Sequence, residues 1–176
     1  MKKLIIATIM ATTSMSTMAA QPFGAGAGYD IGFSPRGGAL NLVITGIKAA
    51  RSQILVSAYS FTSKPIAYAL VDAQRRGVKV FVIGDQQQNS NNYTALTYLA
   101  NNGVPVALNG HYQDFHDKYM IIDGMHVETG SFNFSAAATK NAENAVILWN
   151  VPQIAATYTS DWQEHWREST PVKGNY

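Results

Sequence analysis

The strongest constraint on the fold is an alternation of two apolar patterns along the chain. Residues 54–59 and 78–83 form short apolar runs with the length of buried strands. Between such runs, apolar residues recur at helical spacing, as they do over 40–47 and 66–73. Strands that alternate with helices favour helices packed against a largely parallel sheet.

The second half of the chain has a different pattern. Residues 118–122 and 125–129 are strand-like and are separated by Asp123-Gly124, a strong signal for a hairpin turn. Another strand is expected at 145–149, and Pro152 opens a C-terminal helix. Further predicted elements are a strand at 27–33, a helix that begins near Tyr93 and a short strand at 104–108. The predicted fold is α/β, with a mixed, largely parallel central sheet flanked by helices on both faces.

The first twenty residues have the order of a bacterial export signal. Lys2 and Lys3 precede an apolar run over 4–11, and small residues follow as far as Ala19 and Ala20. The apolar run is much shorter than the roughly 20 residues that a membrane-spanning helix needs. We therefore expect residues 1–20 to be removed and 21–176 to form a single domain in the periplasm or outside the cell, without stable membrane insertion.

Composition limits the chemistry of this domain. The chain has no cysteine, which excludes disulfides, thiolate metal sites and a cysteine nucleophile. It has 13 Lys and Arg against 11 Asp and Glu, and removal of Lys2 and Lys3 leaves 11 of each. A near-neutral protein does not coat nucleic acid through bulk charge, so any phosphate site must be local.

Chemistry-bearing residues are concentrated around the predicted hairpin. His116 and Lys118 are two positions apart on an extended segment, so their side chains share a face. An imidazole and an ammonium placed together can address one phosphate, with the first attacking phosphorus and the second neutralising an oxygen. Met120 and Ile122 continue the same face and should pack beneath the site. Asp123 lies at the turn, where its carboxylate can hold a neighbouring group.

Three polar residues follow the hairpin. Ser131 and Asn133 stand after Gly130 and offer neutral hydrogen-bond donors, and Glu143 precedes the strand expected at 145–149. A carboxylate bonded to one imidazole nitrogen would select the tautomer that leaves the other nitrogen free to attack.

These residues resemble the signature of the phospholipase D superfamily. That signature is His-x-Lys-x4-Asp, then Gly-Ser-x-Asn, then a Glu before an apolar strand. The matching positions are His116, Lys118, Asp123, Gly130, Ser131, Asn133 and Glu143. Further similarity lies in residues 33–35 and 58–63, so the resemblance extends from about residue 29 to 166.

The resemblance implies a two-step phosphodiester reaction without a metal or another cofactor. His116 would attack phosphorus and form a phosphohistidine, while Lys118 and Asn133, with Ser131, would bind the phosphoryl oxygens. Glu143 would orient the imidazole. Asp123 belongs to the predicted catalytic set, as a structural support or partner of a catalytic side chain rather than as a proton carrier.

The family mechanism needs two histidines, and this chain has one copy of the signature. A two-fold symmetric homodimer would bring two copies of His116 together at its interface. A short, exported, single-copy chain looks like the bacterial nuclease branch of the superfamily. The implied function is a largely sequence-non-specific endonuclease that acts on DNA, with RNA as a secondary candidate substrate.

Several alternatives remain open at this stage. A metal site could use His111, Asp114, His116, Asp117 and His126, which lie close together in the sequence. A serine-hydrolase site, by contrast, is excluded, because the pair Gly130-Ser131 does not form the Gly-x-Ser-x-Gly elbow. A lipid phosphodiesterase would need an exposed apolar rim, which the sequence does not reveal. A nucleic-acid-binding module would keep the fold without turnover. The polar stretch 86–92 is either a solvated loop or a substrate-facing one.

Overall fold

The computed structural model describes residues 20–90 and 94–174, so the predicted export signal lies outside the described residues except for Ala20. The elements, in chain order, are β1 (Gly28–Ser34), α1 (Gly38–Ala49), β2 (Gln53–Ala58), α2 (Lys64–Arg75), β3 (Lys79–Asp85), α3 (Ala95–Asn101), β4 (Val106–Asn109), β5 (Lys118–Ile122), β6 (His126–Gly130), the 3-10 helix η1 (Ala137–Thr139), β7 (Glu143–Trp149), α4 (Pro152–Glu168) and β8 (Thr170–Pro171).

The strands form one eight-stranded sheet in the order β1-β7-β6-β5-β2-β3-β4-β8. The α/β fold with a mixed sheet and helices on both faces is confirmed, but the expectation of a largely parallel sheet is wrong. Within the described residues, only β2–β3 and β3–β4 pair in parallel, and the other five pairings are antiparallel. The physical reason is that β5, β6 and β7 follow one another without a long crossover helix, which parallel pairing requires.

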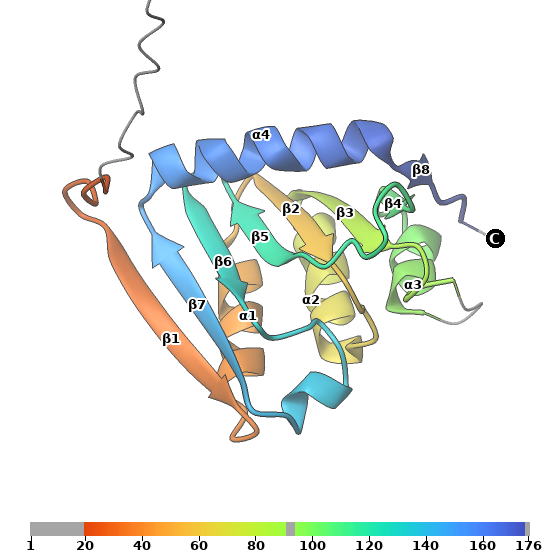
Figure 1. Cartoon of the computed structure of the whole chain (residues 1–176), viewed down its shortest axis with the longest axis horizontal. Coiled ribbons are helices and arrows are strands. Elements are labelled where there is room, and N and C mark those ends of the chain that lie inside the picture. Colours follow the sequence, from red (N-terminus) through yellow and green to blue (C-terminus); the bar gives the residue numbers. More distant parts are fainter. Residues whose placement is uncertain (1–19, 91–93, 175–176) are drawn as a thin grey trace, which may run out of the picture.

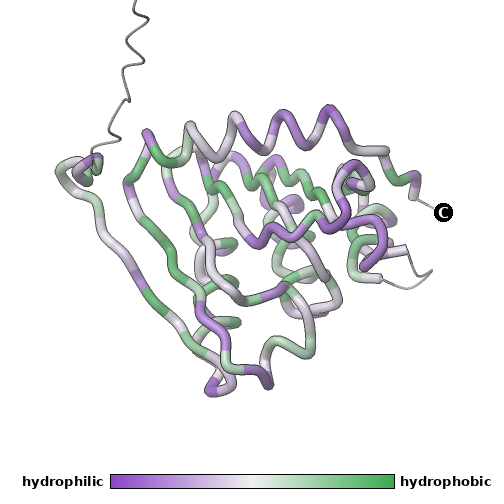
Figure 2. The backbone as a smooth tube through the Cα atoms, in the orientation of Figure 1, coloured by the Kyte–Doolittle hydropathy of each residue, from purple (hydrophilic) through white to green (hydrophobic). Residues whose placement is uncertain are grey.

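Helices cover the two faces of the sheet unequally (Figure 1). On one face, α1, α2 and α3 pack over a core that includes Val43, Ile66 and Met120. On the other face, α4 lies across β2, β4, β5 and β6 and buries Trp162. Apolar stretches follow the central strands, while most of α4 after its first turns is polar or of intermediate hydropathy (Figure 2). Among the described residues, the helices are too short or too polar to cross a bilayer.

Helix boundaries agree with local sequence signals. Pro65 lies in the first turn of α2, and Ser63 occupies the N-cap position, although its side chain makes no capping hydrogen bond in the described part of the chain. In α3 the cap is formed, because the Thr94 side chain accepts a hydrogen bond from the Thr97 N–H. Tyr93, which was expected in this helix, lies outside the described residues.

The antiparallel pairing of β5, β6 and β7 positions the candidate site. The start of β5, the end of β6 and the start of β7 lie side by side, because neighbouring antiparallel strands run in opposite directions (Figure 1). The sequence segments that carry most of the signature therefore meet at one end of these strands.

Candidate active site

Most of the signature residues line one hollow of about 450 Å³ at this end of β5, β6 and β7. It is lined by His116, Lys118, Gly130, Ser131, Asn133 and Glu143. His116 and Lys118 come from the entrance to β5, Ser131 and Asn133 from the loop after β6, and Glu143 from the start of β7. Five of the six residues predicted for the site are thus brought together, and Asp123 is not among them.

His116 and Lys118 share a face as their spacing predicts. The Lys118 Nζ lies 3.0 Å from His116 Nδ1 and donates a hydrogen bond of 2.8 Å to the His116 carbonyl. Pairing between β2 and β5 extends beyond the strand, because the Tyr59 N–H donates to the Asp117 carbonyl. This bond holds the backbone next to His116 in place. Below the pair, Met120 is fully buried and supports the site.

Tyr59 is a site residue that sequence reasoning did not identify. Its ring centroid lies 4.3 Å from that of His116, and Lys118 Nζ lies 5.0 Å from the Tyr59 ring centre. The Tyr59 hydroxyl donates a hydrogen bond of 3.1 Å to Asp114. The tyrosine ring therefore contacts both members of the phosphate-addressing pair. Its position directly after a buried strand is a signal that could have identified it.

Burial shifts the pKa of Lys118. Removal from water lowers the pKa of Lys118 below its ordinary value, and the carboxylates of Asp117 and Glu143 oppose this effect. A bound phosphodiester would add negative charge beside the ammonium and favour its ionised form.

The loop after β6 is held close to β7. A side chain at Gly130 would collide with the Asn144 carbonyl and come within 2.9 Å of the Ala145 Cα, so only glycine allows this approach. Phe132 and Phe134 are buried on either side of Asn133 and anchor it. The buried Oδ1 of Asn133 has no hydrogen-bond partner among the described residues. The side chain at this position is thus fixed by its neighbours rather than by bonds of its own.

Glu143 has partners that differ from the expected one. Its carboxylate accepts a hydrogen bond of 2.6 Å from Ser131 Oγ and another of 3.1 Å from Asn141 Nδ2. The expectation that it holds the imidazole of His116 is not met within the described part of one chain, where Lys118 faces His116 Nδ1 instead. The register explains this, since β6 lies between the strands that carry Glu143 and Lys118.

Asp123 is separated from the hollow and lies at the other end of β5. Its carboxylate accepts hydrogen bonds from the backbone N–H groups of Arg51, Ser52 and Gln53. Partial burial alone would raise the pKa of Asp123, but these backbone donors outweigh it and lower the pKa. These bonds support the structural role expected of Asp123, because its carboxylate joins the α1–β2 loop to the hairpin, and they correct its inclusion in the catalytic set.

Two buried polar residues support the approach to His116, and sequence reasoning did not identify them. Asp85, at the end of β3, accepts a hydrogen bond of 2.9 Å from the Phe115 N–H. Asn89 donates to the Tyr59 carbonyl and accepts from the Phe61 N–H. Asn89 belongs to the polar stretch 86–92, whose residues 86–88 form an exposed turn and whose last two residues lie outside the described part of the chain. A polar residue directly after a buried strand is the signal that marks Asp85.

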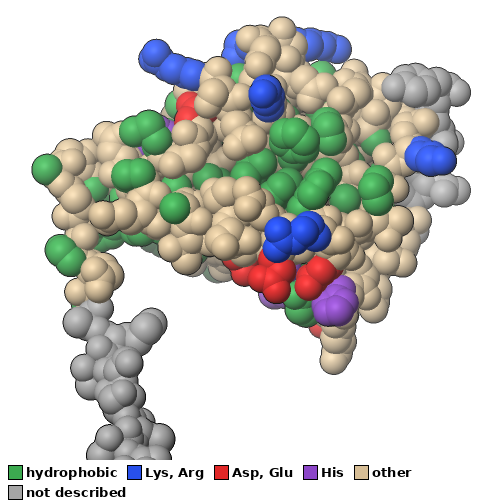
Figure 3. All heavy atoms as spheres, turned by 90° about the horizontal axis from the view of Figure 1, so that it is seen from above, with side chains coloured by type: hydrophobic (Ala, Val, Ile, Leu, Met, Phe, Trp, Pro, Cys, Tyr) green, Lys and Arg blue, Asp and Glu red, His purple; other side chains and the backbone are tan. Residues whose placement is uncertain are grey.

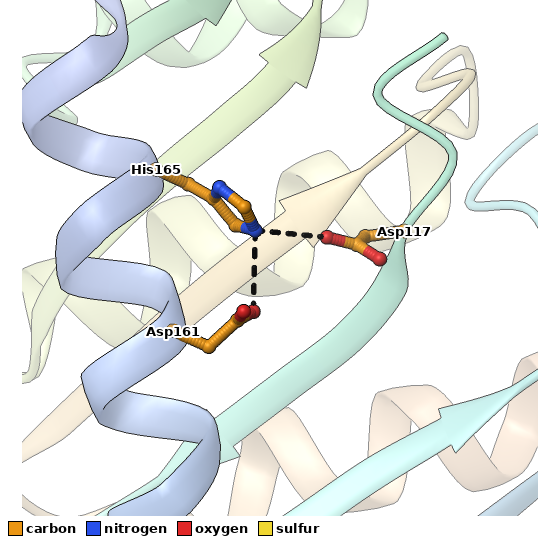
Figure 4. Close-up of side chains that lie close together, drawn as sticks. All are labelled: Asp117, Asp161 and His165. Atoms are coloured by element: carbon orange, nitrogen blue, oxygen red, sulfur yellow. Dashed lines mark ion pairs between the residues drawn. The ribbon is translucent and has the colours of Figure 1, made fainter. Parts of the chain in front are cut away.

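A second cluster of titratable residues joins α4 to the entrance of β5 (Figure 4). Asp117 and Asp161 both point toward His165, with carboxylate oxygens 3.7 and 3.3 Å from its Nε2. Within the described residues, these three side chains are the ones whose ligand atoms lie close enough together to hold a metal ion. They include one member of the metal set suggested by sequence, Asp117. His126 lies at the far end of the β5–β6 hairpin and its Nδ1 accepts the Asn150 N–H.

Comparisons with known proteins agree with this geometry. Residues 43–166 match the family described as cardiolipin synthase, PLD-like domain. The chain is 35% identical over 131 residues to a phospholipase D of Rickettsia bellii, which covers 74% of this chain and 65% of that protein. It is 26% identical over 140 residues to a mitochondrial cardiolipin hydrolase of Mus musculus, covering 78% of this chain and 62% of that protein. The chain thus spans about two thirds or less of the length of these relatives.

Two solved structures have the same fold. Nuc from Salmonella typhimurium, a phospholipase D family member, superposes with a TM-score of 0.82 at 40% identity and covers 84% of this chain and 99% of that one. NucT from Helicobacter pylori superposes with a TM-score of 0.74 at 26% identity, covering 83% and 99%.

The family match covers most of the chain, and the hollow contains the residues of the superfamily signature. The chain therefore belongs to the phospholipase D superfamily.

Proposed function

We propose that this protein is a metal-independent, largely sequence-non-specific endonuclease that hydrolyses phosphodiester bonds in DNA or RNA. The observation that carries the proposal is the contact between His116 and Lys118 in a polar hollow open to solvent. An imidazole beside an ammonium provides a nucleophile and a charge that neutralises the phosphate. The hollow is lined by polar side chains and lies at a sheet edge that an extended strand of nucleic acid can reach.

The reaction would proceed in two displacements at phosphorus. In the first, a nitrogen of His116 forms a bond to phosphorus while the bond to the leaving oxygen breaks, and that oxygen takes a proton from an acid. In the second, water attacks the phosphohistidine, gives its proton to the same group and releases His116. Lys118 and Asn133 would bind the non-bridging oxygens throughout, and Ser131 would join them by turning its hydroxyl away from Glu143.

A second copy of the chain would supply the acid, as the second histidine. Glu143 lines the hollow without an imidazole partner from the described part of its own chain, so it is available to the imidazole of a second copy. An uncovered apolar strand lies beside the hollow, because Ser34 at the end of β1 pairs with Glu143. Tyr29, Ile31 and Phe33 on this strand are 71%, 55% and 63% exposed. Burial of this face against a second copy would bring two sites toward one two-fold axis.

The decisive experiment is a nuclease assay with plasmid and single-stranded DNA and with RNA in excess EDTA. We expect cleavage under chelation by the wild-type protein and none by His116→Asn, which should retain the fold because His116 is exposed. Enzyme quenched with denaturant at alkaline pH, where a phosphorus–nitrogen bond survives, should carry a phosphoramidate on His116, detected by mass spectrometry. Complete loss of wild-type cleavage in EDTA, or full cleavage by His116→Asn, would refute this mechanism. Asp72→Asn, an exposed change on α2, serves as the control.

A lipid phosphodiesterase is the second candidate function, and the structure adds an observation in its favour. The exposed apolar residues of β1 form the rim that the sequence did not reveal. Such a rim suits a membrane surface as well as a second copy. The curated relatives named phospholipase D and mitochondrial cardiolipin hydrolase agree with this alternative. Parallel assays on phosphatidylcholine and cardiolipin vesicles would separate the two functions, because cleavage of lipid but not DNA would replace the nuclease proposal.

We further propose that the enzyme acts in the periplasm or outside the cell. The proposal rests on the order of Lys2, Lys3, the apolar run and the small residues before Gln21. N-terminal sequencing of the exported protein should give a start at Ala20 or Gln21, whereas an intact Met1 would contradict it.

A further inference from the structure

A second hollow of about 210 Å³ adjoins the phosphate-addressing hollow. It is lined by Tyr112, Asp114, Phe115, His116, Asp117 and His165. His116 lines both hollows. A group bound in the second hollow would therefore lie directly beside a phosphate held in the first. We call the second hollow the acidic hollow.

The acidic hollow has the wrong charge for another phosphate. Its walls include the carboxylates of Asp114 and Asp117. The Nε2 of His165 already faces two carboxylates, because oxygens of Asp117 and Asp161 lie 3.7 and 3.3 Å from it. Acidic and histidine side chains gather together at one edge of the molecule when it is seen from above (Figure 3). Carboxylates in this position attract hydrogen-bond donors and repel anions.

The hollow also presents an aromatic ring in a fixed position. Tyr112 is 39% exposed, and its hydroxyl donates a hydrogen bond of 3.1 Å to Glu168. The centroid of its ring lies 5.4 Å from that of His165, in a T-shaped contact, and 6.5 Å from that of Phe115. The backbone of Phe115 is itself bonded to the buried Asp85. These contacts hold Tyr112 in place before a ligand arrives, which reduces the entropy lost on binding.

We propose that the acidic hollow binds the nucleobase next to the scissile phosphate and prefers bases with an exocyclic amino group. This inference rests on the proposed nuclease function and identifies a specificity subsite of the same active site. A nucleobase is the flat, uncharged neighbour of a phosphate in nucleic acid, and Tyr112 offers a ring for stacking. Cytosine, adenine and guanine can each donate a hydrogen bond to the Asp114 carboxylate through a projecting exocyclic amino group, whereas the one donor of thymine is a ring N–H flanked by two carbonyl oxygens, which a carboxylate repels.

The test uses a pool of single-stranded DNA oligonucleotides with one randomised position on each side of a single cleavable phosphodiester. All other linkages in these oligonucleotides are non-hydrolysable. Sequencing of cleaved and uncleaved strands measures the base preference at each position. For the wild-type protein we expect thymine to be depleted about threefold or more at one of the two positions. Asp114→Ala should remove this preference.

Stacking is tested separately from chemistry. Tyr112→Ala should lower kcat/KM by about tenfold on a strand with a base at the preferred position. On a strand with an abasic residue there, Tyr112→Ala and wild type should be equal, because no base is present to stack. Tyr112→Phe keeps the ring and should retain most of the activity. Tyr68→Ala, which removes an exposed tyrosine from α2, is the matched control.

Three results would overturn the proposal. One is equal cleavage next to all four bases by the wild-type protein. Another is an equal loss by Tyr112→Ala on the normal and abasic strands, which would indicate a structural role alone. The third is cleavage of phosphatidylethanolamine vesicles but of no oligonucleotide, which would also refute the nuclease function and assign the acidic hollow to an ammonium headgroup. Cleavage of DNA without base preference would refute the subsite while leaving the nuclease function in place.

Discussion

The orientation of His116 depends on contacts at the scale of single residues. Its imidazole packs against Tyr59, and its Nδ1 lies beside the Lys118 ammonium. Since an exposed imidazole can otherwise rotate, the ring of Tyr59 restricts the positions from which nitrogen can approach phosphorus. The same ring lies close to Lys118 and stabilises its charge through a cation–π contact.

Replacement of Tyr59 should therefore reduce turnover more than binding. Tyr59→Leu removes the ring, and we expect kcat to fall by about ten- to a hundredfold with little change in KM. Tyr59→Phe keeps the ring but loses the bond to Asp114, so it should retain most of the activity. Steady-state kinetics on a fixed oligonucleotide measure both constants. Equal activity of the leucine variant and wild type would contradict a positioning role for the ring.

Glu128 carries a carboxyl group that is buried in the middle of β6. It is 2% exposed on β6, opposite Met120 and Ile147, and its Oε2 has no hydrogen-bond partner among the described residues. Burial raises the pKa of Glu128 from 4.5 to about 8. The native state therefore favours the protonated acid, and the folded protein binds a proton more tightly than the unfolded chain.

This raised pKa predicts a loss of stability with increasing pH. The stabilisation of the folded state by the proton on Glu128 is complete below pH 4.5 and is lost progressively as the pH rises through about 8. Glu128→Gln cannot ionise, so the Tm of wild type relative to this variant should fall by about 10 °C between pH 5 and pH 9. Thermal melts across this range measure the difference. Glu164→Gln, an exposed change on α4, should run parallel to wild type, and parallel curves for Glu128→Gln would disprove the assignment.

At the scale of elements, the two ends of β5 have different functions. One end of β5 carries the phosphate-addressing pair, and the other end is fixed by Asp123. Asp123 and Gly124 have φ values of 55° and 65°, which suits the turn. The Asp123 carboxylate also accepts a hydrogen bond from Ser52 Oγ, so it joins the start of β2 to the hairpin.

Loss of this carboxylate should affect stability and leave chemistry intact. Asp123→Asn tolerates the same backbone conformation but places an amide where backbone donors expect an anion, so unfolding should become easier by about 1–2 kcal/mol at pH 7. Because the native pKa of Asp123 is lowered, this difference should shrink as the pH falls through 3.8 and below. Urea unfolding at several pH values measures it.

The same variant distinguishes the two roles considered for Asp123. At a temperature at which it is fully folded, Asp123→Asn should keep the wild-type kcat. A variant with normal stability and a large loss of kcat would return Asp123 to the catalytic set. Asp72→Asn, in the exposed pair with Arg75, controls for the loss of one charge.

At the scale of the whole molecule, the sheet is covered unevenly. Helix α4 lies over β2, β4, β5 and β6, and the apolar residues of edge strand β1 remain exposed beyond it. An exposed apolar edge strand is a liability unless something covers it. The proposed dimer would cover it and would also complete the active site.

Disruption of this face should dissociate and inactivate the protein together. We expect wild type to have twice the mass of one chain by light scattering, and Ile31→Asp or Phe33→Asp to have the mass of a single chain with cleavage reduced at least tenfold. Tyr68→Asp, on an exposed face of α2, should stay dimeric and active. A fully active single chain would show that the second histidine is not required.

Mixed dimers provide an independent check of the shared site. An excess of His116→Asn should suppress wild-type activity, because a mixed dimer holds one functional imidazole instead of two. Activity that simply follows the amount of wild-type chain present would indicate two independent sites.

The sequence alone determined the local features of this protein. Apolar periodicity predicted most strands and helices because it records which side of each segment is buried. The spacing of His116 and Lys118 predicted their contact because extended backbone alternates its side chains. The positions of Gly130, Ser131, Asn133 and Glu143 predicted the remaining lining of the hollow.

Only the tertiary structure decided which distant segments meet. Strand periodicity is the same for parallel and antiparallel neighbours, so it could not show that β5, β6 and β7 pair antiparallel. Contacts between residues far apart in the sequence placed Glu143 beside Ser131 and Asn141, and Tyr59 against His116. They also placed Asp123 against the α1–β2 loop and left β1 uncovered. These outcomes depend on long-range packing, which a local pattern does not encode.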